Sequence, residues 1–216
     1  MAFYIFDMDG VLLDSMSLWE HLGEEFLRAR GVVPRPGLRE TLATMSMSQS
    51  AEFLHREYGI PGSIKEIVAQ VDARAEEFYT HRAPLKSGVQ PMLEMLRRKG
   101  SRCVILTATD RYLAEAALHR TGIAEFFSGI YTCTELGTPK DTPEIFRKVL
   151  EKEAVLPADA VVVEDSLHAI RSARAAGIAT WAVYDESGRD SWPECCAMAT
   201  EAIRSWQEWL ERRENP

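Results

Sequence analysis

No apolar stretch in the sequence approaches the ~20 residues that a membrane-spanning helix needs, so we expect no membrane segment. The N-terminus lacks the charged start and the cleavage site of a secretory signal, and this predicts a cytoplasmic protein. Basic residues are few, 25 against 33 acidic ones, and the net charge of −8 argues against nucleic acid as a partner. The four cysteines match no zinc pattern and are expected to be thiols.

The most informative feature that is present lies at the start of the chain. The apolar run Phe3–Phe6 reads as a buried strand, and Asp7, Asp9 and Gly10 follow it. Two carboxylates placed so close together repel each other and favour a bound cation. An ordinary turn after a strand is the alternative interpretation. A calcium loop is excluded, because that loop needs a further oxygen ligand before its glycine, which here follows Asp9 directly.

Short apolar runs recur along the chain and alternate with helical patterns. This alternation predicts an α/β fold, with a three-layer Rossmann-like core around a five-stranded parallel sheet and right-handed crossovers. The predicted strands are Phe3–Phe6, Cys103–Leu106, Ile130–Cys133, Val161–Val163 and Ile178–Val183.

The interval between the first and second predicted strands differs from the rest. Residues 15–84 contain no convincing strand and are too long for a loop, so they predict an inserted helical domain. Residues 1–14 and 85–216 would form the core domain. A last helix is expected over Glu201–Arg213, where Trp206 and Trp209 occur at helical spacing and are read as packing residues.

Polar residues follow three further predicted strands. Thr107 ends the second strand, Lys140 lies in the loop after the third, and Glu164 and Asp165 follow the fourth. Each has a simpler interpretation: Thr107 as a helix cap, Lys140 as a surface lysine, and the acidic pair as favourable charge at a helix start. An open parallel sheet, however, gathers such residues in one crevice with Asp7. Together they could hold a hard cation and a phosphate beside a carboxylate nucleophile.

These motifs, in this order and spacing, resemble those of the haloacid dehalogenase superfamily of phosphotransferases. Within it, the chain is similar to the β-phosphoglucomutase-like phosphatases, which carry a helical cap of the C1 type after the first strand. The inserted residues 15–84 agree with such a cap. The matching motifs are Asp7-Met8-Asp9-Gly10-Val11, Thr107, Lys140 and Glu164-Asp165.

The resemblance implies a role for each acidic residue. Asp7 would attack phosphorus and form an aspartyl-phosphate, while Asp9 would protonate the leaving oxygen and later activate water. Mg²⁺ would lie between Asp7, the backbone carbonyl of Asp9 and Asp165, with Glu164 nearby or bound through water.

The resemblance also implies how the phosphoryl group would be held. Thr107 and the backbone amide of Ala108 would bind its oxygens, and Lys140 would offset the charge of both phosphate and nucleophile. The expected activity is the hydrolysis of a small phosphorylated metabolite, with sugar phosphates as the first guess and nucleotides as the second. We expect a monomer or weak dimer.

A sugar-phosphate mutase is the main alternative function. In the mutase relatives the cap supplies basic residues from its substrate loop and a histidine from its first helix. The matching loop here, residues 42–50, has no lysine or arginine, and Trp19 stands at the histidine position. Both departures favour hydrolysis. A phosphate- or metal-binding module without turnover is the remaining alternative.

Overall fold

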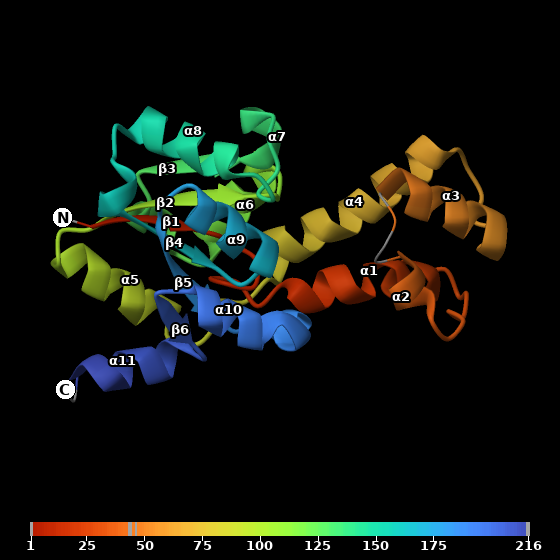
Figure 1. Cartoon of the computed structure of the whole chain (residues 1–216). Coiled ribbons are helices and arrows are strands. Elements are labelled where there is room, and N and C mark those ends of the chain that lie inside the picture. Colours follow the sequence, from red (N-terminus) through yellow and green to blue (C-terminus); the bar gives the residue numbers. More distant parts are fainter. Residues whose placement is uncertain (1, 43–44, 46, 215–216) are drawn as a thin grey trace. The chain divides into compact units, whose positions relative to one another are not determined.

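The computed structural model describes residues 2–42, 45 and 47–214. The chain divides into two compact units, one formed by Met1–Ser15 with Ala83–Pro216 and the other by Met16–Arg82 (Figure 1). Within the described residues, no helix combines the length and the apolar character needed to cross a membrane.

The first unit is built on a six-stranded, fully parallel sheet with the strand order β3-β2-β1-β4-β5-β6. This confirms the predicted α/β class. The chain builds the sheet outward from β1 through β2 to β3, crosses back to the other side of β1, and adds β4, β5 and β6 there. This is the order of a doubly wound fold. The strands are β1 Phe3–Phe6, β2 Arg102–Thr107, β3 Gly129–Thr132, β4 Ala160–Glu164, β5 Ala179–Val183 and β6 Glu201–Ile203.

The predicted number of five strands is wrong, because β6 forms a sixth. The helix expected from Glu201 begins only at Trp206. Its start is marked by the Ser205 hydroxyl, which accepts a hydrogen bond from the Glu208 N–H at 3.1 Å. A strand of three residues is too short to show a periodic pattern, and β6 depends on its parallel pairing with β5.

Helices connect the strands of this unit. The α-helices in the described residues are α5 Val89–Arg98, α6 Arg111–Arg120, α7 Cys133–Leu136, α8 Pro143–Glu153, α9 Leu167–Ala175, α10 Trp192–Met198 and α11 Trp206–Glu214. Short 3-10 turns are η1 Ala124–Phe126, η2 Pro157–Asp159 and η3 Glu186–Ser191. The four cysteines are free thiols, as predicted.

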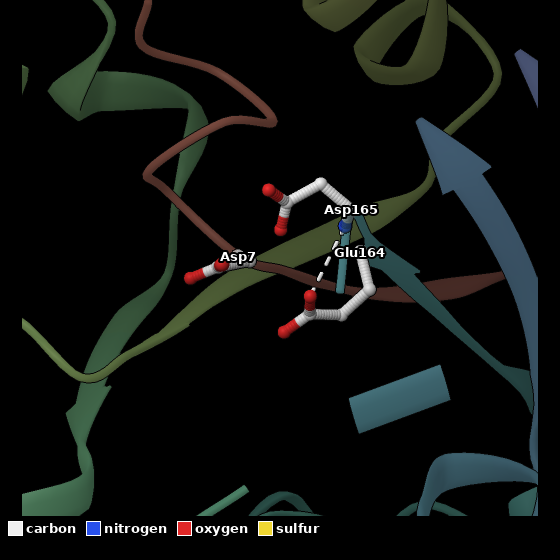
Figure 2. A group of neighbouring side chains, drawn as sticks. All are labelled: Asp7, Glu164 and Asp165. Carbon is white, nitrogen blue, oxygen red and sulfur yellow. Dashed lines mark hydrogen bonds between the residues drawn. The ribbon is translucent and has the colours of Figure 1, made fainter. Parts of the chain in front are cut away.

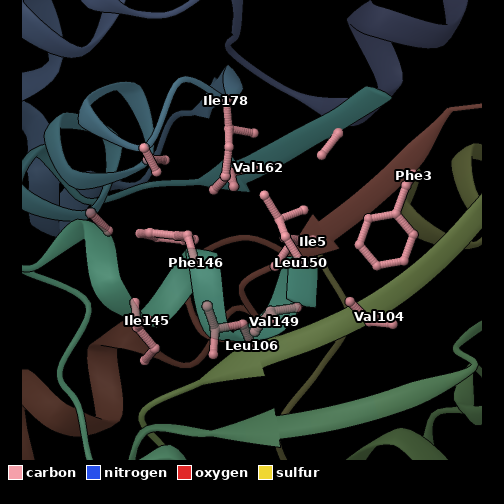
Figure 3. Close-up of a cluster of buried hydrophobic side chains, with 14 residues drawn as sticks. Phe3, Ile5, Val104, Leu106, Ile145, Phe146, Val149, Leu150, Val162 and Ile178 are labelled. Carbon is pink, nitrogen blue, oxygen red and sulfur yellow. The ribbon is translucent and has the colours of Figure 1, made fainter. Parts of the chain in front are cut away.

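Strand β1 is buried on both faces, and its side chains alternate between two cores. Phe3 and Ile5 pack in the cluster that α8 and α9 form with the sheet (Figure 3). Tyr4 and Phe6 instead contact aromatic rings, and the Phe6 ring centroid lies 6.3 Å from that of Trp206. A strand embedded in this way holds the residue that follows it, Asp7, in a fixed position.

Helix α11 is tied to the loop that follows β1. The Trp206 indole N–H donates to the Val11 carbonyl at 2.9 Å, and its ring packs against Trp209 at 5.7 Å. Both tryptophans are buried, which confirms that they are packing residues. The chain's last helix therefore stabilises the loop that starts beside Asp9.

The second unit is helical. Its helices in the described residues are α1 Met16–Arg28, α2 Leu38–Leu42, α3 Met47–Tyr58 and α4 Ile64–His81. Helix α4 begins with a reciprocal capping box between Ser63 and Glu66. The Trp19 indole donates to the Tyr79 hydroxyl at 2.9 Å and so links α1 to α4. In the predicted substrate loop, residues 43, 44 and 46 lie outside the described residues.

Candidate active site

The candidate site lies where the winding of the sheet reverses, at the carboxyl ends of the neighbouring strands β1 and β4. Phe6 pairs with Val163, and the Asp7 N–H donates to the Val163 carbonyl at 2.9 Å. Asp7 therefore comes next to Glu164 and Asp165, and Figure 2 shows these three carboxylates together. Side-chain oxygens of all three lie within 4.8 Å of one another.

Lys140 links two of these acids, although it comes from a third segment of the chain. Its Nζ lies 2.5 Å from Asp7 Oδ1 and 2.8 Å from Glu164 Oε1. Only 8% of the lysine is exposed, so the alternative interpretation as a surface lysine is wrong. An ammonium group buried this deeply needs paired charges around it.

Glu164 is almost fully engaged by the protein itself. While Oε1 accepts from Lys140, Oε2 accepts from the backbone N–H groups of Asp165 and Ser166, both at 3.1 Å, and from the Ser166 hydroxyl at 2.9 Å. These amides lie just before α9, whose N-cap residue is Ser166, and they belong to the loop and not to the first turn of the helix. Glu164 thus orients Lys140 as well as the loop that carries Asp165.

Burial sets the protonation of the cluster. It raises the pKa of Asp7 to about 7, against the opposing effect of Lys140. Burial, with the nearby Glu164 and Asp7, raises the pKa of Asp165 well above its ordinary value. Burial also acts to raise the pKa of Glu164, but Lys140 and Ser166 outweigh it and leave that pKa lowered. The cluster has more acids than Lys140 can pair, as expected for a site that receives a cation.

Asp9 lies in its own hydrogen-bond network. Its Oδ1 accepts from the Ser15 hydroxyl at 2.5 Å, and its Oδ2 accepts from the Thr109 hydroxyl at 2.7 Å. Both hydroxyls were missed by sequence reasoning. Thr109 lies 100 residues away from Asp9, and the run Thr107-Ala108-Thr109 was the only sequence signal for it.

Thr107 is fully buried at the end of β2, beside β1. Its hydroxyl accepts the Thr109 N–H at 3.0 Å, whereas Asp110 occupies the N-cap of α6. Thr107 therefore shapes the turn before the helix and is not the helix cap. Ala108, the next residue, is exposed.

The fold and this cluster define a doubly wound α/β domain with a carboxylate-lined site at its switch point. A family model for haloacid dehalogenase-like hydrolases matches residues 1–177. The chain therefore belongs to the haloacid dehalogenase-like hydrolases, which confirms the resemblance seen in its motifs.

Two similar curated proteins are named as phosphatases. A phosphorylated carbohydrates phosphatase of Thermotoga maritima is 26% identical, with 82% of each chain covered. Hexitol phosphatase B of Escherichia coli is 27% identical, over 80% of this chain and 78% of that protein.

Solved structures share the fold. One from Thermotoga maritima has a TM-score of 0.84 at 24% identity and covers 99% of both chains. The protein CbbY of Rhodobacter sphaeroides, solved with xylulose-(1,5)bisphosphate, has a TM-score of 0.74 at 27% identity over 95% of both chains.

The raised pKa values of Asp7 and Asp165 predict how the metal-free protein responds to pH. The folded state retains protons that the unfolded state releases, so its melting temperature in EDTA should fall as pH rises from about 5 to 8. Asp165→Asn removes one of these acids. We expect a flatter pH dependence and a higher melting temperature at pH 8, by about 2–4 °C for each ~1 kcal/mol relieved.

The matched control is Asp190→Asn, since Asp190 is fully exposed. Differential scanning calorimetry of the three proteins measures the effect. An Asp165→Asn variant with the same pH slope as the wild type would contradict the electrostatic strain assigned to this cluster.

Proposed function

We propose that this hydrolase is a magnesium-dependent phosphatase that cleaves small phosphorylated metabolites, sugar phosphates above all, through an aspartyl-phosphate on Asp7. One observation carries the proposal. The Asp7 side chain, which is only 12% exposed, forms an ion pair with the buried Lys140 and lies against Glu164 and Asp165. Such an arrangement suits a nucleophile that must approach an anion.

The main obstacle to this reaction is electrostatic. A carboxylate that attacks a phosphate experiences a like-charge repulsion of several kcal/mol at ~4 Å, even with an effective dielectric near 20. Lys140 is already paired with Asp7 and offsets part of this repulsion. In the proposed mechanism it also contacts the transferring oxygens, while Thr107 and the Ala108 amide bind the others.

A divalent cation fits the donors that are present. Asp7 and Asp165 would bind it through carboxylate oxygens and Asp9 through its backbone carbonyl. Glu164 would assist from nearby or through water, since Lys140 and the following loop occupy its oxygens. Oxygen donors of this kind suit Mg²⁺, which when bound neutralises phosphate charge.

Asp9 is the proposed acid and base. It first gives a proton to the leaving oxygen and then takes one from the water that attacks the aspartyl-phosphate. The Ser15 and Thr109 hydroxyls support this role because they restrict the orientation of the carboxylate from both sides.

We place sugar phosphates first among the substrates because of how two relatives are named. One is a phosphorylated carbohydrates phosphatase and the other is hexitol phosphatase B. Nucleotides are the second choice. The residue 42–50 segment has no lysine or arginine for a second phosphate, which favours hydrolysis over a mutase. We assign the helical unit Met16–Arg82 the role of the cap.

Replacing the nucleophile tests the mechanism most directly. Asp7→Asn should lower Mg²⁺-dependent phosphate release from p-nitrophenyl phosphate by more than about a thousandfold, because an amide cannot form the acyl-phosphate. Its melting temperature at pH 8 should not fall, since burial disfavours the ionised Asp7 carboxylate and Glu164 still pairs with Lys140. Asp190→Asn is the surface control with unchanged activity. Retained turnover in folded Asp7→Asn would disprove the assignment.

Asp9→Asn should respond differently to good and poor leaving groups. p-Nitrophenolate leaves without a proton, so this variant should release a burst of about one equivalent and then turn over slowly, because water activation is lost. A sugar alcohol phosphate needs the acid in the first step and should show no burst, with kcat lowered by about 10²–10⁴. Rapid-quench kinetics separates the steps, and an equal burst with both substrates would exclude Asp9 as the acid.

A substrate panel tests the proposed class. We expect kcat/KM to be at least about tenfold higher for sugar and sugar alcohol monophosphates than for nucleoside monophosphates, a discrimination of ~1.4 kcal/mol. β-Glucose 1-phosphate should yield inorganic phosphate. Its efficient conversion to glucose 6-phosphate, followed by NMR, would instead establish a mutase.

A further inference from the structure

Lys140 is delivered to the site by the segment between α7 and α8. This segment turns at Gly137, whose φ of 63° is left-handed, and continues through Thr138 and Pro139. The Lys140 side chain must then pair at the same time with Asp7, which follows β1, and with Glu164 at the end of β4. Its position therefore depends on how firmly this segment is held.

A second lysine, Lys148 on α8, holds the segment just before Lys140. Its Nζ donates to the Leu136 carbonyl at 3.0 Å and to the Thr138 hydroxyl at 2.6 Å. Thr138 is only 8% exposed, and its hydroxyl donates in turn to the Leu136 carbonyl at 3.3 Å. A lysine ammonium has three donors, and two of them are used on this short stretch.

The third partner of Lys148 is less important. Glu144 Oε1 lies 2.9 Å from the ammonium, one helical turn away, but the Glu144 side chain is 63% exposed. Exposed pairs at this spacing contribute little. An ordinary surface lysine would have only such a partner. The bonds to Leu136 and Thr138 indicate instead that Lys148 holds the segment before Lys140 in place.

We propose that Lys148 is a positioning residue for the phosphatase reaction, which acts by fixing the segment that presents Lys140. This inference rests on the proposed function. Within the part of the chain that the structure describes, Lys148 forms no ion pair with an acid of the site. Its effect passes through Thr138 and the Leu136 carbonyl to the backbone of Lys140. Displacing a catalytic group by a fraction of an ångström is enough to slow a reaction that depends on alignment.

Lys148→Met tests the proposal because it keeps the apolar stem and removes the three donors. We expect kcat for p-nitrophenyl phosphate to fall about tenfold. Lys148→Arg keeps the charge and several donors, and should recover kcat to within about threefold of the wild type. The matched control is Lys152→Met on the same helix, where the lysine is exposed and kcat should not change.

A double-mutant cycle separates positioning from general stability. Thr138→Val removes the hydroxyl that Lys148 binds, so the Lys148→Met and Thr138→Val double variant should be no slower than the slower single variant. Multiplicative losses would overturn the proposal. Should Lys148→Met melt at a much lower temperature, Thr138→Val and Lys148→Arg still test the same contact.

The outcomes distinguish this inference from the proposed function. A wild-type protein that releases no phosphate from any tested ester refutes the function itself. An active wild type whose Lys148→Met variant keeps the kcat of Lys152→Met refutes the role of Lys148 alone. A lowered melting temperature with unchanged kcat also refutes it, because that result describes a merely structural lysine.

Discussion

The structure depends on the compensation of buried carboxylates by one buried lysine. Asp7, Glu164 and Asp165 lie together at the ends of two neighbouring strands, and Lys140 pairs with the first two. Leaving buried acids without a counter-charge costs stability, which the rest of the fold must supply. The excess of acidic groups over lysine also favours the binding of a cation. The same electrostatic repulsion therefore affects both the stability of the fold and the proposed chemistry.

The surrounding scaffold restricts this cluster from several directions. Strand β1 is buried on both faces, and α11 holds the loop after it through Trp206. Ser15 and Thr109 orient Asp9, and Lys148 anchors the segment that carries Lys140. Preorganisation of this kind lowers the cost of aligning charged groups during a reaction.

Much of the fold could be predicted because its signals are local. Apolar runs alternating with helical patterns predicted the parallel sheet, and the acidic motif after Phe6 predicted where the site would lie. Strand β6 could not be found in this way, because its three residues carry no period and it forms only against β5. The hydroxyls of Ser15 and Thr109 were missed since serine and threonine occur in many loops without any role.

The sequence by itself determined the class of protein, since motif residues and their order survive without coordinates. The sequence also determined the α/β pattern and the identity of the acids, because both can be read from the spacing of nearby residues. Only the tertiary structure decided the partnerships. Lys140 is buried between Asp7 and Glu164 because segments far apart in the chain pack together. Lys148 contacts the loop before Lys140 because α8 folds back beside the segment that precedes it. Hydrogen bonds act over about 3 Å, a distance that only folding establishes.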